Sequence, residues 1–338
     1  MIALVASLAL AAPAPLPRDV QLPVHVASAV SVSEVTRVDE AAGTFDATVD
    51  VLLRWQDPST AFDRLQAGTD RKTWIRDEAD ARRAELWDPR IEIVNLAGEP
   101  ESRDTSFRIH ADGRIEYTQR IRGTFETPID LARFPFDSQR LVVQLTSPDH
   151  DARQVRLVHE QADVERSTIS PAVSLPEWTV GPRVNFTGDE VRGLDGMLHS
   201  ELQASVGIAR LARAYVASLF APLAVILMLP VLCIWVKTDI HERVNWVVTA
   251  VFSLIALNFS VSISYPALGI DSMFMRLFWY GYVAQGTALG LIMLLFNESR
   301  LAAWLGEDLI EEAVEYLSWS LPLVIALAFG DVILALAT

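Results

Sequence analysis

The hydrophobic pattern of the chain changes near residue 210, and each side of that point predicts a different kind of structure. Before it, apolar and polar residues alternate, as in the stretch from Phe45 to Trp55, which has the period of two expected of a half-buried strand. After it, long runs of Leu, Ala, Val, Ile and Phe reach the length of about 20 residues that a membrane-spanning helix needs. We therefore expect a β-domain over residues 15–210 and a helical membrane domain over residues 211–338.

The β-domain is predicted to be an immunoglobulin-like β-sandwich of about ten strands, because short strands recur between polar turns. Ala111-Asp112-Gly113 separates two of these strands and has the composition of a tight hairpin turn. Residues 57–83 are polar and irregular, with room for a short helix. The strands, including the two beside this turn, are expected at 24–32, 45–55, 91–94, 106–110, 114–118, 141–146, 155–158, 178–186 and 198–208.

Four segments of the second half have spanning length, at about 213–236, 244–264, 274–296 and 316–337. The second is the most polar of the four. Residues spaced alternately by three and four along it form one stripe of an α-helix, graded from acid through amide and hydroxyl to bulky apolar groups. The stripe consists of Glu242, Asn245, Thr249, Phe252, Ala256, Phe259 and Ile263. Such a stripe lines an aqueous path or packs against a neighbouring helix, and the segment alone leaves both interpretations open.

Composition excludes several classes of function. The net charge of −15 argues against nucleic-acid binding. The chain has one cysteine, Cys233, so it forms no internal disulfide. Ser147, His150 and Asp151 share one loop but do not have the arrangement of a catalytic triad, and the histidines lack metal-ligand spacing. We expect no enzyme activity, no cofactor and no metal site. Residues 1–14 are apolar and end in small residues, which predicts a signal peptide although a positively charged start is missing.

One motif and four further positions, in a fixed order, carry a resemblance to a known family. The loop Phe134-Pro-Phe-Asp-Ser-Gln139 is similar to the signature loop of the pentameric ligand-gated ion channels, the Cys-loop receptor superfamily. Thr127 and Leu141 occupy the positions of the flanking half-cystines, so the chain resembles the bacterial branch that lacks the disulfide. The other matching positions are Trp87-Asp-Pro89, Arg210, Glu242-Arg243 and Pro266.

The resemblance implies a homopentamer in which each subunit has a periplasmic β-sandwich and four helices, with the second helix lining the pore. It also implies contact with membrane lipids and conduction of monovalent cations. Glu242 would form a ring of carboxylates at the cytoplasmic mouth, which attracts cations. Asn245 and Thr249 would replace part of the hydration shell of an ion, and Phe252 and Phe259 would form apolar rings that close the path.

By the same resemblance, two further groups of residues have roles in gating. Carboxylates around Arg210 would tie the sandwich to the helices, and the coupling residues are Asp39, Glu40, Phe134, Pro135, Asp137, Arg210 and Pro266. The agonist site would lie between subunits under the loop at about 187–198. Its expected residues are Phe186, His199, Thr146, Asp149, Trp87 and Arg108. The agonist is unknown, with an amine or a proton as the two options, and His199 makes pH modulation a hypothesis.

The main alternative function is a non-conducting periplasmic sensor or binding protein anchored by the helices. The graded stripe argues against it, because an anchor needs neither the grading nor Glu242. An exported N-terminus and four crossings return the C-terminus to the outside. Together with the resemblance to the bacterial branch, this implies a protein of the bacterial inner membrane, with the N-terminal domain and the C-terminus in the periplasm. The distribution of Lys and Arg between loops supports this orientation only weakly.

Overall fold

The computed structural model describes residues 20–171, 173–235 and 239–296, together with Leu16 and scattered positions between 306 and 330. The predicted signal peptide lies outside the described residues, and so does most of the predicted span 316–337. The chain divides into two compact units. The first comprises Met1–Pro128, Arg140–Pro176 and Val180–Ile208, and the second comprises Ile129–Gln139, Glu177–Thr179 and Ala209–Thr338.

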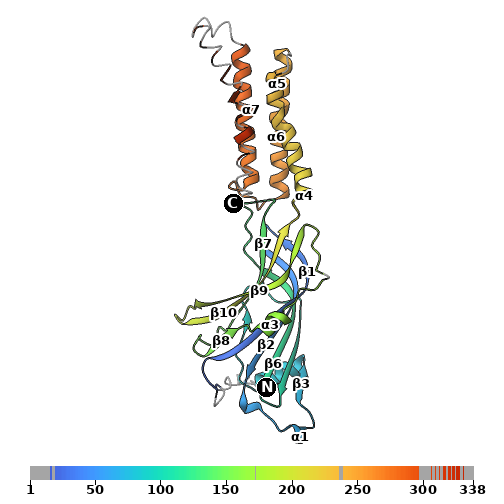
Figure 1. Ribbon diagram of the computed structural model, residues 1–338, viewed down its shortest axis with the longest axis vertical. Coiled ribbons are helices and arrows are strands. Elements are labelled where there is room, and N and C mark those ends of the chain that lie inside the picture. The colour runs from blue at the N-terminus through green and yellow to red at the C-terminus, as the bar shows by residue number, and fades with distance from the viewer. Residues whose placement is uncertain are drawn as a thin grey trace, which may run out of the picture. The chain divides into compact units, whose positions relative to one another are not determined.

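The described part of the first unit is built on ten strands in two sheets (Figure 1). The six-stranded sheet has the order β3 (Arg71–Ile75), β5 (Ser102–His110), β6 (Arg114–Glu126), β2 (Thr44–Gln56), β1 (Val24–Asp39) and β8 (Val155–Val158). The four-stranded sheet has the order β4 (Glu92–Ile93), β7 (Ser138–Thr146), β10 (Leu198–Arg210) and β9 (Trp178–Arg192). The short helices are η1 (Pro58–Thr60), α1 (Arg64–Ala67), α2 (Asp77–Ala84) and α3 (Gln161–Arg166). The predicted β-sandwich of about ten strands is confirmed.

The core of this unit lies between the two sheets. Alternation along β2 buries Phe45, Val49 and Leu53 and leaves the polar residues between them at least partly exposed. Phe45 from the six-stranded sheet and Val143 and Val206 from the four-stranded sheet line the same small internal space. Burial of alternate side chains from both sheets therefore holds the sandwich together.

Two strands differ from the prediction for identifiable reasons. β1 continues to Asp39, beyond residue 32, because register shifts between Val32 and Glu34 and between Val35 and Arg37 interrupt the alternation that marks a strand. β3 was expected to be irregular, since four of its five side chains are exposed. Backbone pairing with β5 makes it a strand, and that pairing leaves no periodic signal in the sequence. The Asp-Gly hairpin is confirmed, with Gly113 at φ +82° between β5 and β6.

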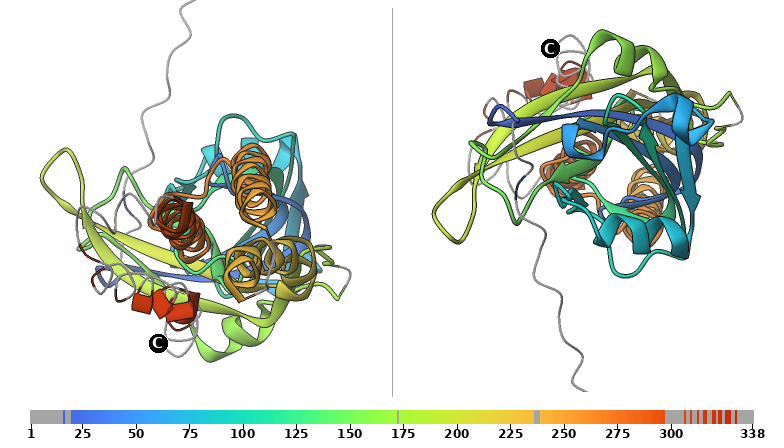
Figure 2. Two further views of the ribbon diagram at one scale, coloured as in Figure 1. Left: turned by 90° about the horizontal axis from the view of Figure 1, so that it is seen from above. Right: turned by 90° about the horizontal axis from the view of Figure 1, so that it is seen from below.

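The second unit is helical over most of its described length. α4 (Ala212–Tyr215), the π-helical turn η2 (Val216–Phe220) and α5 (Ala221–Trp235) follow one another without a break. α6 (Ile240–Ser264) and α7 (Met273–Phe296) complete the set, and the three long helices lie side by side (Figure 2). These helices occupy the first three of the four predicted spans. Within the described residues, α6 is the helix whose length and composition suit a membrane crossing.

Aromatic and aliphatic side chains form the core of the second unit. Leu223 and Leu227 of α5, Leu254 of α6 and Phe274 and Phe278 of α7 belong to one buried cluster. The loop at 129–139 contributes Phe134 to the same cluster, and that side chain is fully buried. The signature loop is thus part of the helical unit although it lies between two strands in the sequence.

Candidate functional site

The predicted stripe of α6 faces away from α5 and α7, the other two long helices in the described part of the chain. All seven stripe side chains are exposed, and Phe252, Phe259 and Ile263 expose 67%, 68% and 65% of their surface. The buried residues of α6 are Val247, Ala250, Leu254 and Val261, which lie on roughly the opposite side of the helix. Leu254 packs in the cluster with α5 and α7, and Val247 packs with Ala284 and Ala288. The stripe is therefore not the face through which α6 packs against α5 and α7.

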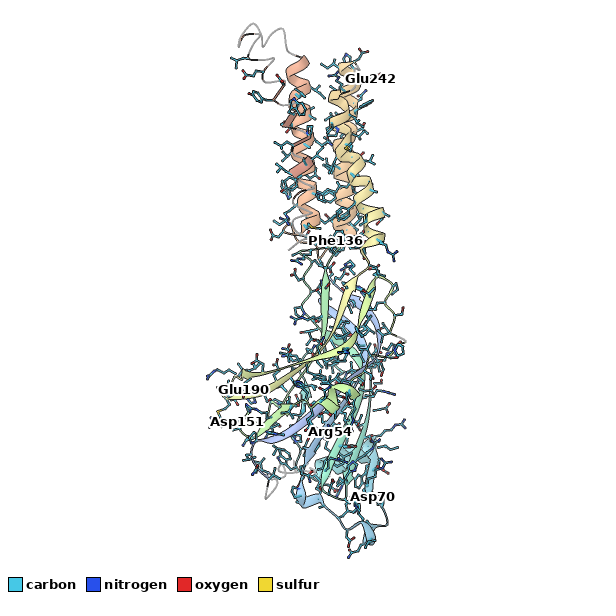
Figure 3. The ribbon with its side chains drawn as sticks, viewed as in Figure 1. Arg54, Asp70, Phe136, Asp151, Glu190 and Glu242 are labelled. Atoms are coloured by element: carbon cyan, nitrogen blue, oxygen red, sulfur yellow. The ribbon has the colours of Figure 1, made fainter. Side chains whose placement is uncertain are left out.

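The polar end of the stripe lies at the start of α6. Asp239 is the N-cap residue, and its carbonyl oxygen accepts hydrogen bonds from the backbone N–H groups of Glu242 and Arg243 at 3.0 and 3.1 Å. Glu242 is exposed in the first turn (Figure 3), whereas Arg243 is half-buried. The two neighbouring charges are thus unequally accessible, and the carboxylate is the more exposed of the two.

Arg210 and Asp137 form a buried ion pair inside the helical unit. The guanidinium donates from Nε to Oδ1 at 2.7 Å and from Nη2 to Oδ2 at 3.1 Å. Their side chains expose 0% and 2% of their surface. Gln139 donates a further hydrogen bond to Asp137 at 2.7 Å. The signature loop therefore brings its carboxylate to the arginine as the sequence predicted, in the planar two-bond geometry that favours arginine.

Three residues without a predicted role complete the surroundings of Arg210. Tyr215 Oη accepts from Arg210 Nη1 at 3.1 Å and donates to the Glu177 carboxylate at 2.7 Å. The ring of Trp178 lies 4.1 Å from the guanidinium carbon, within the range of a cation–π contact. Glu177 and Trp178 are more than thirty residues from Arg210 and belong to no motif, so the sequence offered no signal for them.

Phe134 connects the signature loop to three helical-unit rings. Its ring centroid lies 5.1 Å from Tyr215, 5.3 Å from Tyr265 and 6.1 Å from Phe274. The peptide bond between Phe134 and Pro135 is cis. The loop is therefore fixed by aromatic packing as well as by the ion pair.

The remaining predicted coupling residues are less buried. Asp39 pairs with Arg37 and accepts a hydrogen bond from the backbone N–H of Ala42 at 3.0 Å, so it closes the turn after β1. Glu40 is half-buried in that turn, and Pro266 is exposed just after α6.

Three of the six predicted agonist-site residues have separate partners in the single chain. Thr146 donates to the carbonyl oxygen of Ser200 at 3.1 Å. Phe186 stacks on His159 at 5.3 Å, with the rings 16° from parallel. Arg108 lies on β5 in the six-stranded sheet, 3.9 Å from the carboxylate of Glu116.

The other three residues lie around the segment that follows β7. The ring of Trp87 lies 5.7 Å from that of His150, and Asp149 lies 3.8 Å from Arg90. His199 is buried against the same segment, with its Nδ1 3.0 Å from the carbonyl oxygen of Ser147. Residues 147–150 are therefore the place where predicted agonist residues converge.

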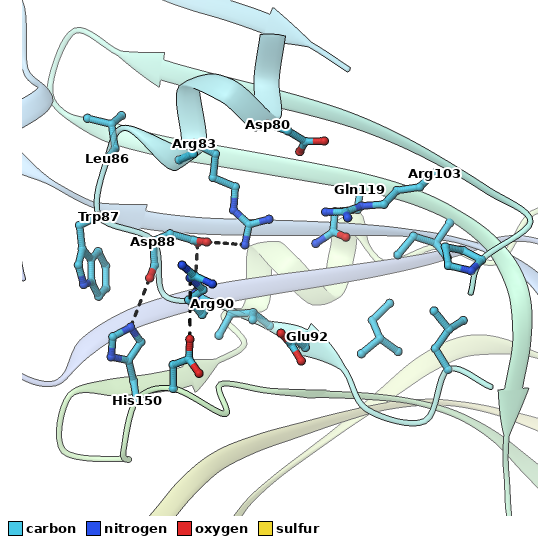
Figure 4. Close-up of a pocket in the computed structure, with 17 residues that line it drawn as sticks. Asp80, Arg83, Leu86, Trp87, Asp88, Arg90, Glu92, Arg103, Gln119 and His150 are labelled. Carbon is cyan, nitrogen blue, oxygen red and sulfur yellow. Dashed lines mark hydrogen bonds and ion pairs between the residues drawn. The ribbon is translucent and has the colours of Figure 1, made fainter. Parts of the chain in front are cut away.

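A cleft of about 870 Å³, lined by both charged and apolar side chains, opens beside this segment (Figure 4). Arg83, Arg103 and Gln119 extend into it from α2, β5 and β6, and Trp87 and Asp149 also line it. Arg83 pairs with Asp88 at 2.7 Å, and Arg103 donates to Tyr117 Oη at 2.8 Å. Burial lowers the pKa of Arg83, but Asp88 and Tyr117 outweigh it and hold that pKa above its usual value. In the described part of the chain, no cluster of three or more His, Cys, Asp or Glu residues is arranged to hold a metal ion.

Fold and site together define a class of two-part chain, with a β-sandwich unit and a helical unit that contains a buried arginine–aspartate pair. A family described as the neurotransmitter-gated ion-channel ligand binding domain matches residues 12–210, which is more than half of the chain. The chain belongs to this family, and the resemblance stated from its motifs is confirmed.

The relatives of known function that the chain resembles are an ion channel and subunits of neurotransmitter receptors. The chain is 27% identical over 244 residues to the proton-gated ion channel of Gloeobacter violaceus, covering 72% of this chain and 65% of the relative. It is 23% identical over 227 residues to the neuronal acetylcholine receptor subunit alpha-4 of Mustela putorius furo, covering 67% and 35%. It is 28% identical over 138 residues to the gamma-aminobutyric acid receptor subunit pi of Rattus norvegicus, covering 39% and 29%. The chain thus spans less than two thirds of the length of each of these relatives.

Proposed function

We propose that this chain is the subunit of a homopentameric, ligand-gated, cation-selective ion channel of a bacterial inner membrane, and that five copies of α6 line its pore. The exposure of all seven stripe residues carries the proposal. A stripe that runs from a carboxylate to phenyl rings, and that α5 and α7 leave uncovered, suits both water and copies of itself as neighbours. Rotational symmetry about a pore axis supplies both.

Cation selectivity is assigned to Glu242. Five carboxylates at one mouth of a pore lower the local energy of cations and raise that of anions. The exposure of Glu242 and the partial burial of Arg243 support this assignment, because an arginine in the lumen would cancel the charge of the ring.

The gate is assigned to Phe252 and Phe259. Both side chains are more than half exposed on the stripe, and rings of phenyl groups around an axis form constrictions that dewet. Asn245 and Thr249, nearer to Glu242, would contact ions that have lost part of their hydration. Ala256 and Ile263 complete the lining.

Coupling is assigned to the loop that carries Asp137. Arg210 lies two residues before the start of α4, so displacement of the signature loop would act on the first helix through the ion pair. Asp39, Glu40 and Pro266 are proposed to act with it from the turns that follow β1 and α6. The agonist is proposed to be an amine or a proton, and the name of the Gloeobacter relative favours the proton.

We also propose the membrane topology. Four spans at about 213–236, 244–264, 274–296 and 316–337 would place the sandwich and the C-terminus in the periplasm, in contact with lipid only through the helices.

Recording from the purified full-length protein in planar bilayers tests the proposal. Cation-selective currents that depend on acidification or on an added amine are the expected result. A correctly assembled pentamer that carries no current across a screen of pH and amines would instead support the alternative, a non-conducting membrane-anchored sensor.

A further inference from the structure

The imidazole of His199 faces hydrogen-bond acceptors at both of its nitrogen atoms. Nδ1 lies 3.0 Å from the carbonyl oxygen of Ser147 and 3.0 Å from that of His150. Nε2 lies 3.2 and 3.1 Å from the two carboxylate oxygens of Asp195. A neutral imidazole has one donor and one acceptor nitrogen, so either tautomer would direct a lone pair at an oxygen. Only the protonated ring satisfies every contact.

The ring joins two segments that are distant in sequence. Asp195 belongs to the turn between β9 and β10, which we define as residues 193–197, and Ser147 and His150 belong to the segment after β7. The His199 side chain exposes 11% of its surface. A Cβ added at Gly193 would lie 2.8 Å from two atoms of the ring, so the backbone of the 193–197 turn approaches the ring closely.

The 193–197 turn has its own hydrogen bonds, which aim Asp195 at the ring. The N–H of Gly193 donates to the carbonyl oxygen of Met197 at 2.9 Å, and the N–H of Met197 donates to Asp195 Oδ1 at 2.9 Å. Arg192 donates from Nη1 to the carbonyl oxygen of Gly196 at 3.0 Å. The turn is thus a preformed unit that His199 attaches to the 147–150 segment.

The other charged groups nearby have different partners. Asp149 lies 3.8 Å from Arg90, and Asp151 accepts the backbone N–H groups of Arg153 and Gln154 at 3.0 Å each. The His150 ring packs against Trp87, with its Nε2 3.3 Å from the carbonyl oxygen of Asp88. In the described part of the chain, Asp195 is the one carboxylate hydrogen-bonded to His199.

We propose that His199 is a proton-operated latch, in which proton binding to the ring fastens the 193–197 turn to the 147–150 segment and proton loss releases it. The latch regulates the loop at 187–198, under which the sequence predicts the agonist site, and it rests on the proposed function only for its effect on current. The chemical ligand is the proton itself, held between a carboxylate and two carbonyl oxygens.

The direction of the pH dependence follows from the contacts. Burial lowers the pKa of His199, but the hydrogen bonds to Asp195, Ser147 and His150 outweigh it and hold that pKa above its usual value. The pKa of Asp195 is lowered, first by the N–H of Met197 and then by His199. A raised histidine pKa in the folded state stabilises that state fully below the unfolded value, and the contribution is lost as pH rises through the folded value. The latch is therefore fastened in acid and released as the pH rises through the raised pKa of His199.

Hydrogen exchange of the 193–197 turn in the full-length pentamer tests the latch, with protection factors corrected for intrinsic exchange at each pH. We expect protection to fall about tenfold as the pH rises through the pKa of His199, which NMR of the imidazole reports independently. Asp195→Asn keeps the size of the side chain and removes its charge, and it should lower both the His199 pKa and the protection in acid. Asp189→Asn is the matched control, because Asp189 lies on β9 and accepts from the N–H of Glu190 rather than from His199.

Equal protection in acid and in mild alkali, or an Asp195→Asn protein with the wild-type pH dependence, would overturn the latch. Current recordings separate this result from the proposed function. If the protection of the turn depends on pH but the protein never conducts, the latch is supported and the channel function is refuted. If the protein conducts but the protection of the turn does not depend on pH, the channel function is supported and the latch is refuted.

Discussion

Arg210 and Asp137 are joined by two hydrogen bonds from which solvent is almost wholly excluded. Breaking a buried pair by removing one partner leaves a charge without compensation, which costs about 3–5 kcal/mol. Removing the charge of either residue should therefore have a larger effect than removing a charge from an exposed pair.

We expect Arg210→Ala to abolish gating or assembly, and Asp137→Asn to weaken both. Arg210→Lys should be intermediate, since an ammonium group cannot reproduce the planar two-bond contact. Agonist-evoked current and thermal stability of the pentamer measure the effect. Arg122→Ala is the control, because the Arg122–Glu101 pair is exposed and should contribute less than about 1 kcal/mol. Normal currents from Arg210→Ala would refute the coupling role.

Glu242→Gln should reduce the preference for cations over anions, because it removes five charges from one ring while keeping the size of the side chain. Reversal potentials in asymmetric salt give the permeability ratio. Asp271→Asn is the comparison, since Asp271 is exposed and lies outside the stripe, between α6 and α7. If the two variants shift the reversal potential equally, Glu242 has no special place in the pore.

Phe252→Ala should raise the resting current and the single-channel conductance, because it widens an apolar constriction and lowers the cost of wetting it. Ile255→Ala removes apolar surface from a side chain of α6 that is 47% exposed but lies off the stripe. Its conductance should remain at the wild-type value. A larger conductance change in Ile255→Ala than in Phe252→Ala would mean that the stripe does not face the lumen.

Gly113→Ala should destabilise the sandwich more than Gly98→Ala. Both residues have positive φ, at +82° and +77°, so each substitution costs about 1–2 kcal/mol in backbone strain. At Gly113 a Cβ would also lie 2.7 Å from the carbonyl oxygen of Asp57, whereas it meets nothing within 4 Å at Gly98. Thermal unfolding of the two variants compares them, and equal melting temperatures would contradict the close approach at the hairpin.

Sequence periodicity predicted those elements whose side chains are buried on one face. β2 and the stripe of α6 follow from periods of two and of about 3.6 residues, because one face of each is covered. β3 was missed since its side chains are mostly exposed and only its backbone is paired. The second half of β1 was also missed, because its register shifts interrupt the alternation of apolar and polar residues.

Within the candidate site, the sequence predicted only those residues that belong to a recognisable motif or position. The loop of Asp137 and the position of Arg210 are recognisable, so their contact could be expected. Glu177, Trp178 and Tyr215 reach the same arginine through the fold, and nothing in their local sequence indicates it. His199 is predicted as an agonist-site residue, and its hydrogen-bond partners in the single chain are Asp195 and two carbonyl oxygens. Those partners could not be derived from the sequence, because the spacing of a side chain beside a loop does not fix its surroundings.

The compact unit that contains α5, α6 and α7 also contains residues 129–139 and 177–179. A chimera that exchanges helices with a relative by a single cut at residue 210 would therefore inherit the helices from one parent and Asp137 and Phe134 from the other. Moving the two short loops together with the helices keeps Arg210 beside the carboxylate with which it folds. The residues that must be exchanged together are therefore those in contact in the folded chain, and they come from three separate stretches of the sequence.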